Sequence, residues 1–147
     1  ALDYSKAAVD VIQAFAIQNA GWRLQAKCHD LTQGLPFENG AFDACYSHML
    51  LCMAMPFSAI QTLADEIWRV LRPGGAHVFT VRHTGDAHYR SGPHHGENLY
   101  ETGGFVVHFF SREMVDVLIG RHQLIEIAEF EEGKLPRRLY RVTAVKT

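Results

Sequence analysis

The sequence predicts an α/β protein with a largely parallel sheet. Segments typical of strands alternate with segments typical of helices along most of the chain. The 147 residues match the size of one domain, and a composition of 48% hydrophobic and 20% charged residues is typical of a globular chain. A chain of this length buries enough surface to fold without disulfides or metal. We therefore expect a single domain over residues 1–147.

The first predicted helix follows Ser5, a favourable N-cap residue. Apolar side chains recur with helical spacing from Val9 to Ala16, and Gly21 is expected to close the helix. Residues 22–28 alternate in polarity, which predicts a short strand.

Residues 42–47 predict a buried strand, and the segment after it has the clearest helical pattern in the chain. Ser58 and Gln61 have the spacing of a capping box at the start of this helix. Pro73-Gly74-Gly75 is expected to end it, because proline cannot continue a helix and glycine permits a sharp reversal. A further strand is predicted over residues 76–81.

Residues 85–104 are rich in glycine and lack periodicity, which predicts a long irregular excursion. We expect this excursion to form a lid on the substrate side. Ser111 is expected to begin a helix that ends near Arg121. Leu124–Phe130 and Leu139–Val145 have the alternation of two strands, and their spacing predicts an antiparallel hairpin.

The charge balance argues against several classes of partner. Fourteen Lys and Arg against sixteen Asp and Glu give a net charge of -2, which offers no electrostatic footprint for nucleic acid or an anionic membrane. The three cysteines form no CxxC pair and are expected to be reduced thiols. No apolar run reaches membrane-spanning length and no signal peptide is expected. These features predict a cytoplasmic protein.

Three strand ends are the expected places for chemistry, because ligands of open α/β sheets bind outside the carboxyl ends of the strands. Asp3 precedes the first helix, Asp30 follows the strand that ends at Cys28, and Ser47-His48 end the next strand. Carboxylates at successive strand ends suit a nucleoside, one for the ribose hydroxyls and one for an exocyclic amine. Aspartate is also common in turns and at helix starts, so a purely architectural role stays open for both.

The sequence resembles the class I S-adenosylmethionine-dependent methyltransferases of the small, type 11-like kind. Four pieces carry the resemblance in the order and spacing of that family: LDYS, HDLTQGLPFENGAFDACYS, LADEIWRVLRPGG with AHVFTV after it, and FFSREMVDVL. The resemblance implies a Rossmann-like sheet, mostly parallel with a C-terminal antiparallel hairpin, and helices on both faces. The family's glycine-rich loop would lie before Ala1. The first strand and first helix of that fold are therefore expected to be absent from this chain.

The resemblance also implies roles for residues at the strand ends. Asp3 would bind the ribose hydroxyls of S-adenosylmethionine, with Tyr4 packed near the adenine. Asp30 would accept from the adenine amine, and the backbone N–H of Leu31 would face a ring nitrogen. Ser47 would line the site beside the methionine part of the cofactor.

Methyl transfer depends chiefly on positioning, because the sulfonium already makes the methyl group electrophilic. A weak nucleophile still needs a base. The candidate catalytic side chains are His48, His83, Tyr100 and His108, although each also suits an ordinary lid or surface residue. The histidines lack a familiar ligand spacing, so no metal site is expected.

The preferred function is therefore an S-adenosylmethionine-dependent methyltransferase that acts on a small molecule by direct in-line transfer. A non-catalytic methyltransferase-like module for binding or oligomerisation is the alternative, because the glycine-rich loop is not in this chain. A nucleotide-binding oxidoreductase fits the order of elements but not the Pro-Gly-Gly signature. The segments ENLYETGGF and FEEGKLPRRLYRVTAVKT are similar to tellurite-resistance-type methyltransferases, which implies a soft nucleophile. The expected partner is a small-molecule substrate, and a homo-oligomer stays open.

Overall fold

The computed structural model describes residues 1–133 and 137–147. The chain divides into two compact units, Ala1–Pro36 and Phe37–Thr147. Each unit is described by itself below, and the predicted single domain over the whole chain stays a prediction.

The N-terminal unit is a β-α-β arrangement. Strand β1 (Leu2–Asp3) pairs in parallel with β2 (Lys27–Cys28), and α1 (Lys6–Gln18) connects them. The predicted cap of α1 is confirmed, because the Ser5 hydroxyl accepts from the N–H of Ala8.

Two predictions in this unit are wrong in extent. Helix α1 ends at Gln18, and its C-cap is Asn19 rather than Gly21, because the amide side chain of Asn19 donates to the carbonyl of Phe15 and satisfies the end of the helix early. The strand predicted over residues 22–28 forms only at its last two residues, since β1 offers it only two partner residues.

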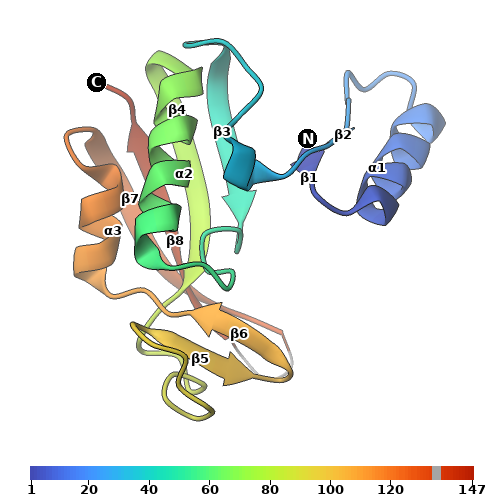
Figure 1. Cartoon of the computed structure of the whole chain (residues 1–147). Coiled ribbons are helices and arrows are strands. Elements are labelled where there is room, and N and C mark those ends of the chain that lie inside the picture. The colour runs from blue at the N-terminus through green and yellow to red at the C-terminus, as the bar shows by residue number, and fades with distance from the viewer. Residues whose placement is uncertain (134–136) are drawn as a thin grey trace. The chain divides into compact units, whose positions relative to one another are not determined.

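The C-terminal unit is built on a four-stranded sheet in the order β3-β4-β8-β7 (Figure 1). Strand β3 (Phe42–His48) is parallel to β4 (Leu71–Arg82), while β7 (Gln123–Glu132) and β8 (Arg137–Val145) form an antiparallel hairpin against β4. This confirms the predicted α/β class and its C-terminal hairpin. Consequently the carboxyl ends of β3 and β4 share one edge of the sheet with the start of β8.

Helices α2 (Phe57–Val70) and α3 (Arg112–Ile119) cover the same face of this sheet (Figure 1). Their apolar side chains pack on the residues of β4 and β8 that point toward them, which removes a continuous apolar surface from water. The core so formed includes Ile60, Leu63, Ile67, Phe79, Val81, Val115, Leu118 and Val142.

The start of α2 differs from the predicted capping box. The N-cap residue is Pro56, which has no side-chain acceptor, and Ser58 lies inside the helix. The carboxylate of Glu97 accepts from the N–H of Phe57 at 2.8 Å instead. An acidic side chain from a distant segment therefore satisfies the helix start and complements its dipole.

The end of α2 also differs from the prediction. The helix stops at Val70, and Leu71 is already extended and paired with Phe42 of β3. Pro73-Gly74-Gly75 lies inside β4 and forms no terminal turn of the helix. The helix has ended at Val70, and the proline that follows could not have continued it.

The excursion over residues 85–104 is more regular than predicted. It contains β5 (Leu99–Thr102), which forms an antiparallel hairpin with β6 (Phe105–His108). Gly103 and Gly104 form the turn with positive φ angles of 59° and 79°, which is the conformation that a tight hairpin requires. The predicted helix after Ser111 is confirmed as α3, with Gly120 directly after it.

Candidate functional site

Two of the acidic residues of the N-terminal unit, Asp3 and Asp30, stand at the ends of paired strands. Asp3 ends β1 and is paired with Cys28 of β2, and the N–H of His29 donates to the carbonyl of Asp3 at 2.9 Å. Asp30 follows directly and begins a short 3-10 helix, η1 (Leu31–Gln33). The expectation that both carboxylates stand at carboxyl ends of neighbouring parallel strands is confirmed.

One oxygen of each carboxylate holds the local turn. Asp3 Oδ1 accepts from the N–H of Ser5 at 2.7 Å, and Asp30 Oδ1 accepts from the N–H and hydroxyl of Thr32 at 2.9 and 2.8 Å. The bonds from Thr32 lower the pKa of Asp30. Within the described ranges, no hydrogen bond uses Oδ2 of either aspartate or the N–H of Leu31. Both aspartates therefore serve the turns and keep an acceptor for a ligand.

Two polar residues end β3 in the C-terminal unit. Ser47 is 7% exposed, and its hydroxyl has no hydrogen-bond partner among residues 1–133 and 137–147. The side chain of His48 is 37% exposed and lies between two polar groups, with Nδ1 2.8 Å from Thr80 Oγ1 and Nε2 3.4 Å from Glu132 Oε1. Arg137 Nη2 lies 3.0 Å from the other carboxylate oxygen of Glu132. The structure thus joins β3, β4 and the β7–β8 hairpin at one edge of the sheet.

The His48 contacts allow two protonation states. The carboxylate at Nε2 favours a proton there, so Nδ1 of the neutral ring accepts from the Thr80 hydroxyl. When the ring is protonated, Nδ1 donates to Thr80 and Nε2–H still faces Glu132. Thr80 Oγ1 has room for this second role, because it otherwise accepts only from the N–H of Met49 at 3.0 Å in the part of the chain described.

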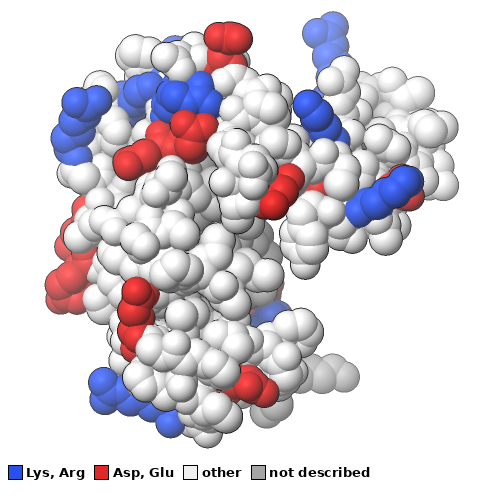
Figure 2. Space-filling model, in the orientation of Figure 1, with Lys and Arg blue, Asp and Glu red and all other residues white. Residues whose placement is uncertain are grey.

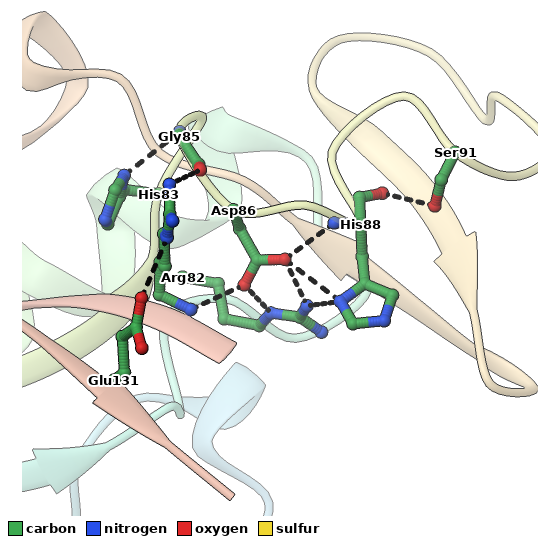
Figure 3. Close-up of polar contacts among 8 residues, drawn as sticks. Arg82, His83, Gly85, Asp86, His88, Ser91 and Glu131 are labelled. Atoms are coloured by element: carbon green, nitrogen blue, oxygen red, sulfur yellow. Dashed lines mark hydrogen bonds and ion pairs between the residues drawn. The ribbon is translucent and has the colours of Figure 1, made fainter. Parts of the chain in front are cut away.

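A buried carboxylate ties the end of β4 to the start of β8 (Figure 3). The side chain of Asp86 is 0% exposed, and its oxygens lie 3.0 and 2.8 Å from Nε and Nη2 of Arg82. The N–H groups of His88 and Arg138 also donate to it, each at 2.8 Å. Burial alone would raise the pKa of Asp86, but these donors outweigh burial and lower the pKa to about 2. The Arg82–Asp86 ion pair is therefore present at neutral pH at the carboxyl end of β4.

His83 follows β4 and is held rigidly. Its Nδ1 accepts from the N–H of Gly85 at 3.0 Å, and its ring stacks on Tyr140 with centroids 4.4 Å apart. Burial lowers the pKa of His83, so the ring is neutral with its proton on Nε2. Nε2 is buried and has no hydrogen-bond partner in the described residues.

Tyr100 and His108 lie on opposite strands of the β5–β6 hairpin. Tyr100 stacks on His94 and contacts the edge of Tyr89, with centroids 4.7 and 5.3 Å apart. The side chain of His108 is 1% exposed, and its Nδ1 donates to the carbonyl of Met55 at 2.9 Å. No hydrogen bond or ion pair in the described ranges joins these residues or His83 to His48.

Sequence reasoning missed the partners of His48 and the Asp86 pair. Thr80 could have been noticed as the last polar residue before the end of a predicted strand. Glu132 gave no such signal, because His48 is remote from it in sequence. Arg82 lies only four residues before Asp86, and that spacing could have indicated the ion pair. No group of three or more His, Cys, Asp or Glu side chains in the described residues is arranged to hold a metal ion.

A comparison with protein-family models identifies the sequence class. The model described as a methyltransferase domain matches residues 1–79, which include both aspartates, Ser47 and His48. The chain belongs to this methyltransferase family. The match extends over more than half of the chain and confirms the resemblance. At the level of the family it also confirms the predicted methyltransferase and its cofactor, S-adenosylmethionine.

Solved structures confirm the fold of the methyltransferase domain. An S-adenosylmethionine-dependent methyltransferase from Methanosarcina mazei matches with a TM-score of 0.82 and 16% identity, over 99% of this chain and 80% of that one. The N-methyltransferase NodS from Bradyrhizobium japonicum, in complex with S-adenosyl-l-homocysteine, matches with 0.69 and 17%, over 99% and 64%. A 1,6-didemethyltoxoflavin-N1-methyltransferase from Burkholderia thailandensis matches with 0.69 and 18%, over 92% and 56%.

The methyltransferase domain spans less than two thirds of the last two of these proteins. No curated protein sequence matches it significantly. Among the helices in the described residues, none combines the length and the apolar character needed to cross a membrane. The cytoplasmic location stays a prediction.

Proposed function

We propose that this methyltransferase transfers the methyl group of S-adenosylmethionine to a small-molecule acceptor bound at the carboxyl ends of β3 and β4. The family match over residues 1–79 carries the proposal, because it includes the ends of β1, β2 and β3, where Asp3, Asp30 and Ser47-His48 lie. The Burkholderia thailandensis relative, whose structure holds 1,6-didemethyltoxoflavin and S-adenosylhomocysteine, supports a small-molecule acceptor.

The residues proposed to bind the cofactor keep polar atoms for hydrogen bonds to a nucleoside. Oδ2 of Asp3 suits the ribose hydroxyls, and Oδ2 of Asp30 suits the adenine amine, with the N–H of Leu31 beside a ring nitrogen. The exposed ring of Tyr4 offers a surface for the adenine. The buried Ser47 hydroxyl lacks a hydrogen-bond partner in the described residues, which supports a ligand contact there.

On the acceptor side, His48 is the best-supported base. In-line transfer breaks the sulfur–methyl bond with both electrons left on sulfur, forms the acceptor–methyl bond, and frees a proton when the acceptor is an alcohol or amine. His48 takes up this proton, and the Glu132 carboxylate 3.4 Å from Nε2 stabilises the resulting imidazolium. His83, Tyr100 and His108 complete the proposed acceptor side, as residues that shape it.

Calorimetric titration with S-adenosylhomocysteine tests the cofactor part of the proposal. We expect micromolar binding, and Asp3→Asn or Asp30→Asn should weaken it at least tenfold, since each removes a charged acceptor. Asp10→Asn is the matched control, because Asp10 lies on α1 and pairs only with Lys6 in the described structure. Absence of binding by the folded protein would favour the non-catalytic module instead.

A further inference from the structure

A cavity of about 500 Å³ lies in the C-terminal unit at the edge of the sheet opposite His48 and Arg82. The last turns of α2 and α3 line it together with Lys146, which follows β8. Strand β8 ends beside Ala76, near the amino end of β4, whereas Arg82 stands at the other end. The volume lies in the range of small-molecule sites. The cavity is therefore separate from the strand ends proposed for methyl transfer.

The carbonyl groups at this end of the helices are already used. Trp68 Nε1–H donates to the carbonyl of Leu118 at 2.9 Å, and the N–H of His122 donates to that of Ile119 at 3.1 Å. Lys146 Nζ caps the carbonyl of Leu71 at 2.7 Å. Because these carbonyl oxygens already accept hydrogen bonds, they attract a cationic ligand only weakly. They also repel an anionic ligand less than the free carbonyl groups of an uncapped helix end do.

Positive charge dominates the side chains around the cavity. Arg69, Arg121 and Lys146 line it against one carboxylate, Asp65. Figure 2 shows Lys and Arg atoms gathered at the upper left of the view, with acidic atoms beside them. Arg69 is held by the carboxylate of Glu66, whereas Arg121 makes no side-chain hydrogen bond or ion pair within the described residues. Arg121 is thus the cation available to a ligand.

The histidine in the cavity responds to this charge. Burial lowers the pKa of His122, and the positive charges of Arg121 and Lys146 lower it further. His122 therefore stays neutral, with its ring 4.2 Å from that of Trp68. Val117 is 51% exposed beside the same cavity. Cationic donors thus stand next to an apolar wall.

We propose that this cavity is a second binding site, for a small carboxylate with an apolar body. The carboxylate pairs with the guanidinium of Arg121, which presents two parallel donors to such a group. The apolar body lies against Val117 and the rings of Trp68 and His122. Asp65 opposes the bound charge and limits the affinity. The site depends on none of the residues assigned to methyl transfer.

Fluorescence of Trp68 provides the test, with benzoate as the probe. The chain has two tryptophans, and Trp22→Phe removes the other, which is 64% exposed. In this background we expect a saturable change of Trp68 emission on titration with benzoate. Arg121→Gln should weaken benzoate at least tenfold, and Asp65→Asn should tighten it, because one removes the pairing charge and the other the repelling charge.

Two further probes separate the parts of the proposal. Benzylamine has the same ring with the opposite charge, and acetate has the carboxylate without the ring, so both should bind at least tenfold more weakly than benzoate. Arg121 and Asp65 are exposed, and retention of the circular dichroism spectrum verifies that both variants fold. Equal binding of benzylamine, unchanged benzoate affinity in Arg121→Gln, or no saturable signal at all would overturn the proposal.

Discussion

His77 is a polar side chain in the apolar core of the C-terminal unit. It is 1% exposed, and its ring lies 5.3 Å from that of Trp68 and 4.8 Å from that of Phe79. Neither ring nitrogen has a hydrogen-bond partner in the described part of the chain. Burial lowers the pKa of His77 from 6.5 to about 3, so the ring is neutral in the folded protein near pH 7.

His77→Phe is expected to stabilise the protein by about 1 kcal/mol at pH 7, because it removes a buried polar group without partners. The unfolded chain binds a proton here near pH 6.5 and the folded chain only near pH 3. The wild-type protein therefore loses stability as the pH falls from 6.5 to about 3. His77→Phe should lose less stability over the same range. Urea unfolding at pH 7 and pH 5 measures both effects, with the exposed His95→Phe as control. A less stable variant at pH 7 would contradict this account.

The Asp86 carboxylate is expected to contribute far more to the free energy of unfolding than an exposed carboxylate does. Asp86→Asn leaves Arg82 buried with its charge unpaired, which costs about 3–5 kcal/mol. Because the pKa is lowered from 3.8 to about 2, the contribution of the wild-type carboxylate is full above pH 3.8 and is lost as the pH falls through 2. Urea midpoints compare this variant with Asp116→Asn, which breaks only an exposed pair with Arg112. Equal midpoints would refute the role of the pair.

His48 and Glu132 should affect turnover rather than cofactor binding. For an alcohol or amine acceptor, we expect His48→Gln to lower the rate about 100-fold and Glu132→Gln about tenfold, with the affinity for S-adenosylhomocysteine retained. Initial rates of labelled methyl transfer and calorimetry measure the two quantities. Thr62→Ala, on the exposed side of α2, is the control. An unchanged rate in His48→Gln would point to a soft, aprotic nucleophile or to another base.

At the scale of elements, Gly75 fixes how β4 enters the sheet. A Cβ added there would lie 2.8 Å from the carbonyl oxygen of Arg72 and 3.1 Å from that of Asp43, both backbone atoms. A Cβ on Gly74 meets no atom within 4 Å, although its φ of 77° strains other residues. The close approach of β4 to β3 is therefore what requires glycine at position 75.

Gly75→Ala should destabilise the protein by roughly 3 kcal/mol, because backbone must move to relieve the overlap. Gly74→Ala should cost about 1 kcal/mol, which is the penalty of a positive φ alone. Thermal unfolding of the two variants side by side measures the difference. The reverse order would mean that the turn conformation, rather than the approach of the strands, limits this segment.

The elements that the sequence predicts well are those defined by local contacts. Ser5 and Ser111 cap their helices through bonds three residues away, and the β7–β8 hairpin follows from alternation alone. The start of α2 could not be predicted, because Glu97 supplies its acceptor from 40 residues away. The strand at Lys27–Cys28 is short for a similar reason, since its partner sets its length.

The candidate site likewise contains some residues whose position the sequence predicts and others whose contacts it does not. Asp3 and Asp30 could be placed beside one another from the order of their strands, because neighbouring parallel strands bring their carboxyl ends to one edge, and Ser47 could be placed at the end of β3. The contact between His48 and Glu132 spans 84 positions, and it exists only because the β7–β8 hairpin reaches the end of β3. No local sequence pattern around His48 or Glu132 predicts this contact.

At the scale of the whole molecule, the charge is nearly balanced. The net charge is -2 and the isoelectric point about 6.5. We expect no retention on a heparin column at 150 mM salt and pH 7.5, because a protein needs clustered positive charge to release the counterions of a polyanion. Retention that weakens with added salt would show that the basic groups act together and would reopen a nucleic-acid partner.

The bond from Arg138 to Asp86 has a consequence for how these positions tolerate change. Arg138 contributes its main-chain N–H at 2.8 Å, and every amino acid except proline carries that donor. Its guanidinium contacts are exposed and worth little. In a library of all single substitutions, position 138 should therefore accept nineteen of the twenty amino acids, whereas position 86 should accept aspartate alone. Positions 86 and 138 would then tolerate very different numbers of substitutions during evolution, although one hydrogen bond joins them.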